Sequence, residues 1–299
     1  MDKNAFNKLY IYCNISLLMA AFISGLSFVA QKLGMHYIGP FTFNTLRCFI
    51  GALSLAPLVL FCKEKCSIKG GVLAGIVLFI AFSINQYCMI YADAGKAGFI
   101  TSLYILFVPV IAIFLKHKLN KNVQIGIGLA LAGLYLLCAK GTFQFEFWDI
   151  LLLISAFFFA LHIITVSHYT KKSDAIKLSI IQFLTAGILS LPLMFLFETP
   201  TMALILAGWK PILFIGVIVT GVAYTLQIFG HKATKPVLAT LILSSEAVFA
   251  VLGGMFILGE TLNIKEILGC IVMLFAIILS QIPNKSKGGK NETDFEPNI

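Results

Sequence analysis

Glu246 is an acidic residue inside a long apolar stretch, and it directly follows two serines, Ser244 and Ser245. A carboxylate is costly to place in an apolar environment, so it usually faces a cavity, pairs with a base or takes up a proton. One interpretation is therefore a coupling site, at which Glu246 binds a proton or a cationic group of a substrate. The alternative is a structural acid that is hydrogen-bonded to the neighbouring serines.

Arg47 is the only arginine of the chain, and it also lies in an apolar stretch, seven residues after Pro40. In a helix this places it roughly 10 Å from the start of the stretch. A guanidinium can hold a carboxylate through two parallel hydrogen bonds, which makes Arg47 a candidate anion contact. The long side chain can also reach the end of its helix or bind neighbouring helix carbonyls. The sequence favours this structural role.

Polar uncharged side chains cluster in corresponding places in the two halves of the chain. Paired polar stripes are typical of a cavity wall. The alternative is that these side chains form hydrogen bonds between helices, which are worth about 0.6 kcal/mol on average. For His162, a packing role is favoured. The candidate substrate-binding residues are Asn85, Gln86, Tyr87, Tyr104, His162, Tyr224 and Gln227.

The elements that must position these residues are helices in a membrane. Hydrophobic residues make up 59% of the 299 residues, charged residues make up 12%, and the mean hydropathy is +0.96. A transmembrane helix needs about 20 apolar residues, and backbone groups in lipid must find hydrogen-bond partners within the protein. The sequence therefore predicts an all-α polytopic membrane protein with ten transmembrane helices. Their centres are predicted near Ala21, Gly51, Phe82, Phe107, Leu131, Phe158, Ala186, Thr220, Phe249 and Leu274.

The lysines alternate between the loops in a pattern that reverses from one half of the chain to the other. Sixteen lysines fall in the two termini and in the loops at 63–69, 116–121, 171–177 and 232–235, and five fall in the remaining loops. Cytoplasmic loops collect Lys and Arg, so the lysine-rich side, which carries both termini, is predicted to be cytoplasmic. The two halves must then lie upside down relative to each other.

This pattern predicts two inverted five-helix repeats, at residues 1–139 and 148–282, which are joined by a linker at 140–147. The polar composition of residues 283–299 predicts a disordered cytoplasmic tail. Inverted repeats are typical of alternating-access transporters, whose substrate site lies near the bilayer midplane between the repeats. The expected partners are a lipid bilayer, a small-molecule metabolite and, through Glu246, protons.

Other classes of function have less support in the sequence. The net charge of +9 follows from the topology, so we expect no nucleic-acid partner. The seven cysteines show no disulfide framework and no metal-ligand spacing, and we expect neither a metal nor a cofactor. A membrane-embedded enzyme would need a clustered nucleophile, base or metal set, whereas the five histidines are scattered. An enzyme is therefore the weaker alternative, and we expect a non-enzymatic protein.

Two segments resemble a known family. Residues 91–104 read YADAGKAGFITSLY and are followed by FVP at 107–109, while residues 245–250 read SEAVFA and are followed by LGETL at 258–262. Their order and spacing resemble the drug/metabolite transporter superfamily, in its EamA-domain branch. Ala247 stands where that family usually has proline, so the sequence lacks the residue that would break this helix.

The resemblance implies a secondary transporter, commonly an exporter of amino acids or other small metabolites, with two five-helix repeats around a central cavity. A sugar or sugar-phosphate carrier of the same superfamily is the alternative. Phosphate groups favour several basic side chains in a cavity, and only Arg47 is available inside a predicted span. Neutral or zwitterionic cargo therefore fits the sequence better.

Overall fold

The computed structural model describes residues 3–62, 64–92, 94–115, 121–138, 146–258 and 264–282. Every regular element in these ranges is helical, and the ranges contain no strand. The first half forms α1 (Lys3–Gly34), α2 (Pro40–Leu55), η1 (Ala56–Phe61), α3 (Ile68–Cys88), α4 (Ala94–Ser102), α5 (Tyr104–Phe114) and α6 (Lys121–Cys138). The second half forms α7 (Phe147–Tyr169), η2 (Thr170–Lys172), α8 (Ala175–Phe197), α9 (Met202–Ala207), α10 (Trp209–Leu213), η3 (Phe214–Ala223), α11 (Tyr224–Gly230), α12 (Pro236–Leu243), α13 (Glu246–Leu258) and α14 (Ile264–Gln281). The predicted tail, and most of the predicted linker, lie outside the described residues.

Seven helical segments in the described part are long and apolar enough to cross a membrane. Two further apolar helices, Pro236–Leu252 and Ile267–Ser280, are shorter. The prediction of an all-α polytopic membrane protein is therefore confirmed, while the count of ten helices remains a prediction. The long segments are Asn7–Gly34, Pro40–Phe61, Ile68–Cys88, Ala97–Phe114, Phe147–Tyr169, Ala175–Phe197 and Trp209–Gly230.

Acidic residues in the loops hold the beginnings of two of these helices. α2 begins with Pro40, and the Glu198 carboxylate accepts hydrogen bonds from the backbone N–H groups of Phe41 and Thr42, at 2.7 and 2.8 Å. Asp174 caps α8 in the same way through its side chain. The first N–H groups of a helix have no partner within the helix, so a carboxylate there satisfies them and complements the helix dipole.

The lysine-rich loops meet at one end of the bundle. Lys232 Nζ lies 2.7 Å from Glu64 Oε2, and Lys177 Nζ donates to the Glu64 carbonyl at 3.0 Å. The backbone N–H of Asp174 donates to the Lys65 carbonyl at 2.9 Å. The loops after α2, α7 and α11 therefore share one end, which is the grouping that the lysine distribution indicates. Which face of the membrane this end meets remains a prediction.

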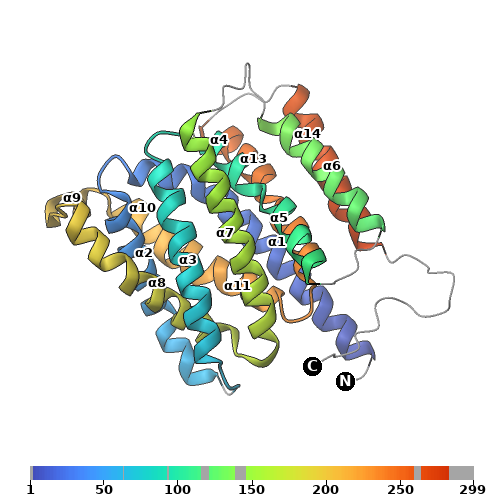
Figure 1. The fold of residues 1–299 in the computed structure, drawn as a ribbon, viewed down its shortest axis with the longest axis horizontal. Coiled ribbons are helices and arrows are strands. Elements are labelled where there is room, and N and C mark those ends of the chain that lie inside the picture. Colours follow the sequence, from blue (N-terminus) through green and yellow to red (C-terminus); the bar gives the residue numbers. More distant parts are fainter. Residues whose placement is uncertain are drawn as a thin grey trace.

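The helices pack closely, and helices from the two halves alternate in space. α6 lies along α14 at one edge of the bundle, as Figure 1 shows. α2 packs on α8, α3 packs on both α7 and α8, and α1 packs on η3, α11 and α13. Small residues permit these contacts: a Cβ atom on Gly75 would lie 2.6 Å from the Gln182 carbonyl, and one on Gly133 would lie 2.9 Å from the Gly269 carbonyl.

Two apolar segments are interrupted in the middle of the bundle. One break separates α4 from α5 at Leu103, and the other separates α12 from α13 at Ser244 and Ser245. The second break forms although Ala247 stands where the family that the sequence resembles usually has proline. The hydroxyls of Ser244 and Ser245 donate to the carbonyls three residues back, and such local bonds compete with the regular helical ladder.

Candidate substrate-binding site

A cavity of about 60 Å³ lies between the two halves of the chain. This is room for water molecules and not for a large ligand. Helices α1 to α5 contribute to its wall from the first half, and α7, η3, α11, α12 and α13 contribute from the second. The polar residues that line it are Ser24, Ser27, Gln31, Arg47, Asn85, Thr101, Tyr104, Tyr224, Gln227 and Glu246.

Glu246 lies at the first position of α13, next to the helix break. Its side chain is 9% exposed, and its Oε1 accepts hydrogen bonds from Tyr104 Oη at 3.1 Å and from Ser102 Oγ at 3.3 Å. The beginning of a helix favours a negative charge, because unpaired N–H groups point toward it. The two donors to Glu246, Ser102 and Tyr104, belong to α4 and α5 in the other half of the chain. The serines next to it bond instead to backbone carbonyls of α12.

Arg47 is buried on α2 and borders the same cavity. Its Nε donates to Thr220 Oγ1 at 3.1 Å, and its guanidinium carbon lies 4.1 Å from the centre of the Phe82 ring. The side chain is 3% exposed, so it does not extend to the bundle surface. Among the described residues, its contacts are therefore a threonine hydroxyl and an aromatic ring and not the helix end or a helix carbonyl, and its role remains a prediction.

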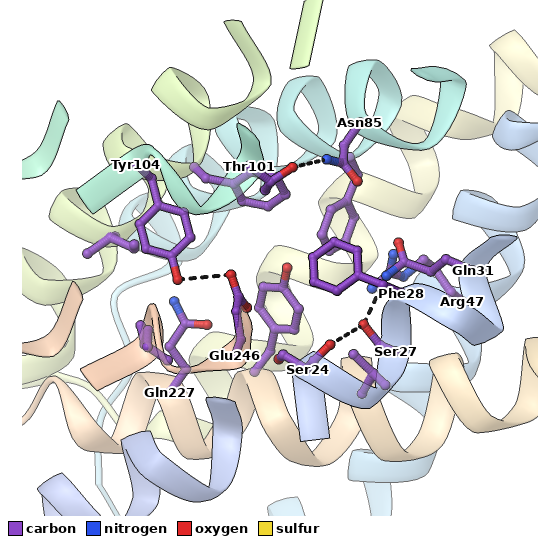
Figure 2. Close-up of a pocket in the computed structure, with 16 residues that line it drawn as sticks. Ser24, Ser27, Phe28, Gln31, Arg47, Asn85, Thr101, Tyr104, Gln227 and Glu246 are labelled. Carbon is purple, nitrogen blue, oxygen red and sulfur yellow. Dashed lines mark hydrogen bonds between the residues drawn. The ribbon is translucent and has the colours of Figure 1, made fainter. Parts of the chain in front are cut away.

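The two charged side chains stand apart. Figure 2 shows Tyr104, Gln227 and Glu246 on one side of the cavity, and Gln31 and Arg47 on the other. In the part of the chain that the structure describes, neither Arg47 nor Glu246 has an ion-pair partner within 4.0 Å. A basic and an acidic side chain, each without a countercharge among the described residues, therefore face one cavity.

Uncharged polar groups and aromatic rings complete the wall. Asn85 Nδ2 donates to Thr101 Oγ1 at 2.8 Å and approaches Ser155 Oγ at 3.4 Å. Gln31 Nε2 donates to Ser27 Oγ at 2.9 Å. These bonds hold the amides in place without using all of their hydrogen-bonding capacity. The apolar part of the wall includes the rings of Phe28, Phe82 and Phe159.

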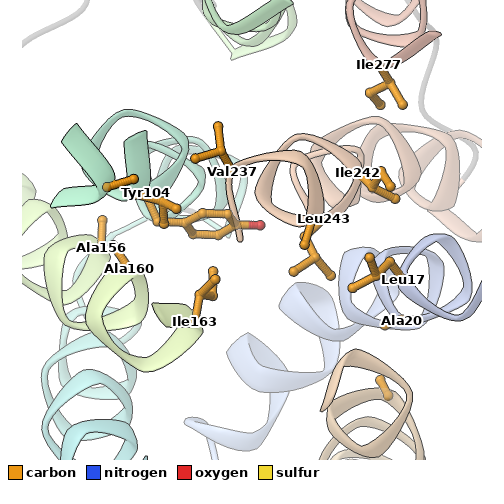
Figure 3. Close-up of a cluster of buried hydrophobic side chains, with 14 residues drawn as sticks. Leu17, Ala20, Tyr104, Ala156, Ala160, Ile163, Val237, Ile242, Leu243 and Ile277 are labelled. Carbon is orange, nitrogen blue, oxygen red and sulfur yellow. The ribbon is translucent and has the colours of Figure 1, made fainter. Parts of the chain in front are cut away.

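An apolar cluster borders the cavity and extends toward the lysine-rich end. It includes Leu17 of α1, Val108 of α5 and Val237 of α12, each closer to that end of its helix than the cavity residues are. Figure 3 shows the cluster, and its members Tyr104, Ile163 and Leu243 also line the cavity. Along these three helices the wall is therefore apolar on the side of the lysine-rich end.

Six of the nine charged and polar residues singled out from the sequence line the cavity, namely Arg47, Asn85, Tyr104, Tyr224, Gln227 and Glu246. Gln86 is buried outside it, and its amide has no hydrogen-bond partner among the described residues. Tyr87 is 38% exposed and packs against Tyr91 and Trp148. His162 Nε2 lies 2.9 Å from Gln182 Oε1, behind the wall. Consecutive residues of a helix point about 100° apart, so Gln86 and Tyr87 cannot share the direction of Asn85.

The first helix, α1, contributes wall residues that were not predicted from the sequence. Ser24, Ser27 and Gln31 all line the cavity from this helix. Their spacing of three and four residues places them on one face of the helix. A search for polar residues at helical spacing in the first apolar stretch would have found them. Nothing comparable marks Phe28, Phe82 and Phe159 among the 27 phenylalanines of the chain.

Comparison with known proteins identifies transporters as the relatives of this chain. The EamA-like transporter family matches residues 11–139 and again residues 146–281. An uncharacterized transporter of Archaeoglobus fulgidus is 32% identical over 270 residues, which cover 90% of this chain and 85% of that protein. The uncharacterized transporter YoaV of Bacillus subtilis is 25% identical, over 89% of this chain and 95% of its own length.

A solved crystal structure shares the fold. It superposes with a TM-score of 0.74 at 15% sequence identity, over 94% of this chain and 97% of the solved one. At this level of identity the likeness concerns the arrangement of the helices and not the cargo. Together with the double family match along the chain, the 32% identical relative shows that this protein belongs to the EamA-like transporter family.

Proposed function

We propose that this protein is a secondary transporter of the cytoplasmic membrane that exports a small polar or amphipathic metabolite by alternating access. An amino acid is the cargo that fits best. The observation that carries this proposal is the placement of Arg47 and Glu246 in one cavity, each without a countercharge in the described part of the chain. A charged group in the membrane is costly, so two such groups are expected to serve a ligand that brings both charges.

A zwitterion supplies the two missing partners. Its carboxylate would accept hydrogen bonds from the guanidinium of Arg47, and its ammonium would donate to the carboxylate of Glu246. The amides of Gln31, Asn85 and Gln227 add neutral hydrogen-bonding groups to the wall. The phenylalanine rings offer an apolar surface for the rest of the molecule. This chemistry is that of an amino acid with an apolar or amphipathic side chain.

Alternating access is supported by the relation between the two halves. The family matches both halves separately, and both contribute to the cavity. If α1, α2 and α3 correspond to α7, α8 and η3–α11, the packing of α3 on α7 has its counterpart in α1 on α11. The packing of α3 on α8 likewise corresponds to that of α2 on η3. Such exchange symmetry is expected for inverted repeats that rock around a fixed site.

Glu246 is the proposed coupling residue. It lies at a helix break, where a half-helix meets the cavity, and its partners Tyr104 and Ser102 belong to the other half. Binding of a proton or of a cargo ammonium would change the strength of these bonds between the halves. The lysine distribution supports a cytoplasmic location for both termini.

A neutral sugar is the second candidate cargo. The amides and hydroxyls of the wall, together with the phenylalanine rings, could bind a sugar without using either charge. A sugar phosphate fits less well, because among the described residues of the wall only Arg47 is cationic. The two charges favour the amino acid over both.

The test is transport in proteoliposomes with a labelled mixture of amino acids, sugars and other metabolites, with and without a pH gradient. We expect wild-type protein to accumulate amino acids in response to the gradient, and Glu246→Gln to lose that response. Glu64→Gln is the matched control, because Glu64 lies in the lysine-rich loops and its exposed ion pair contributes little. Equal, gradient-independent movement by wild type and Glu246→Gln would assign a structural role to Glu246. Accumulation of sugars alone would exclude the amino-acid proposal.

A further inference from the structure

The helical segment opposite Arg47 is unusual. Residues Phe214–Ala223 form a π-helix, η3, between α10 and α11. π-helical turns are rare and occur frequently at functional sites. This one packs on α2 and carries Thr220, whose hydroxyl accepts the hydrogen bond from Arg47 Nε at 3.1 Å.

Both branches of the Thr220 side chain, the methyl and the hydroxyl, contact α2. It is fully buried, and a Cβ atom on Gly51 would lie 2.7 Å from its methyl carbon, so the methyl packs directly on the glycine. Gly51 follows Arg47 by four residues and lies on the same face of α2. The methyl group against Gly51 and the hydroxyl against Arg47 fix the rotamer of this β-branched residue.

The contact between η3 and α2 is close along its length. A Cβ atom on Gly216 would lie 2.6 Å from Ile50 Cγ2, and one on Gly221 would lie 2.6 Å from Ser54 Oγ. Close packing of this kind leaves little freedom for one helix to shift against the other. The hydroxyl of Thr220 is therefore a fixed acceptor that one half of the chain presents to the single arginine of the other.

We infer that Thr220 is a positioning residue that sets the specificity of the cavity for an anionic group. Its hydroxyl engages Nε, and the Phe82 ring covers one face of the guanidinium. The Nη groups are then the donors that remain for the cargo. This inference rests on the proposed function, because it gives Arg47 a cargo carboxylate as its ligand.

The variants Thr220→Val and Thr220→Ser separate shape from hydrogen bonding. Valine retains the methyl against Gly51 and loses the hydroxyl, whereas serine retains the hydroxyl and loses the methyl. Thr225→Val is the matched control, since its hydroxyl bonds to Ser179 Oγ at 2.9 Å and Thr225 does not line the cavity. Gly51→Ala provides a second route, because the added Cβ would displace Thr220.

The first readout needs no cargo. Protein labelled with ¹⁵N-arginine has one Nε–H signal, since Arg47 is the only arginine. In Thr220→Val we expect this proton to exchange with water at least about tenfold faster, because a buried hydrogen bond is lost. In Gly51→Ala we expect faster exchange as well. Thr220→Ser and Thr225→Val should stay within about twofold of wild type. Unchanged exchange in both Thr220→Val and Gly51→Ala would overturn the inference.

The second readout concerns specificity, with L-phenylalanine and L-phenylalaninamide as the probes. In the amide, a neutral carboxamide replaces the carboxylate. We expect the KM for L-phenylalanine, divided by that for L-phenylalaninamide, to rise about tenfold in Thr220→Val, as for one hydrogen bond to a charged group. In Thr220→Ser this ratio should stay near the wild-type value. An unchanged ratio in Thr220→Val would contradict the specificity role. If wild type transports neither probe, the proposed cargo is wrong, and the Nε–H exchange still decides whether Thr220 positions Arg47.

Discussion

The phenolic oxygen of Tyr104 lies 3.1 Å from Oε1 of Glu246, and the two residues are the first of α5 and of α13. Each of these helices begins at a break in an apolar segment, one in each half of the chain. The two breaks are therefore joined by a hydrogen bond to a carboxylate. A bond of this kind contributes more than one between neutral groups, and it connects the two halves that would move in the proposed alternating-access cycle.

Loss of the phenol should weaken transport. In Tyr104→Phe the ring remains and Glu246 loses its nearer donor, so we expect kcat/KM to fall about tenfold or more, as for one hydrogen bond to a charged group. Initial rates in proteoliposomes measure this. Tyr135→Phe is the control, because Tyr135 is 62% exposed on α6. Identical rates for both variants would show that the bond between the breaks has no part in transport.

Arg47→Lys should impair binding although the charge is retained. Lysine has no Nε donor for Thr220 and no planar group to lie on the Phe82 ring. We expect KM for a carboxylate-bearing cargo to rise about tenfold. Lys210→Arg, an exchange at an exposed position outside the cavity, should leave KM unchanged. A wild-type KM in Arg47→Lys would mean that the cavity needs only a positive charge there.

The neighbours Asn85 and Gln86 should respond differently to the same replacement. Asn85→Leu removes an amide from the cavity wall along with its bond to Thr101, so KM should rise. Gln86→Leu removes a buried amide that has no partner in the described residues, so KM should not change and the melting temperature should stay equal or rise. Transport assays and thermal unfolding of the purified variants test the pair. A raised KM in Gln86→Leu would place Gln86 in the site after all.

Two glycines should differ in their tolerance of alanine. In Gly75→Ala the new Cβ would lie 2.5 Å from Thr185 Cβ and 2.6 Å from the Gln182 carbonyl, so α3 and α8 must separate. We expect this to destabilise the protein by about 1–3 kcal/mol and to lower its melting temperature. A Cβ on Gly128 would meet no atom within 4 Å, and alanine favours a helix by up to about 1 kcal/mol over glycine. Equal melting temperatures for Gly75→Ala and Gly128→Ala would contradict the close packing of α3 on α8.

The sequence by itself determined the membrane-helical class and the residues that are costly to bury. Apolar runs of this length must be helices in a bilayer, because backbone groups have no water to bond to. The same cost made Arg47 and Glu246 recognisable, and both line the cavity. The lysine pattern indicated which loops share an end of the bundle, because loops rich in lysine are retained on the cytoplasmic side of a membrane.

Only the tertiary structure decided which face of each helix meets the cavity. α3 and α7 are nearly as apolar on one side as on the other, so periodicity did not tell Asn85 from Gln86 or exclude Tyr87 and His162. The direction of a side chain depends on the rotation of its helix, which contacts between distant segments set. The same holds for the contact between the π-helical segment and α2 that brings Thr220 to Arg47, since it joins helices that are far apart in the sequence.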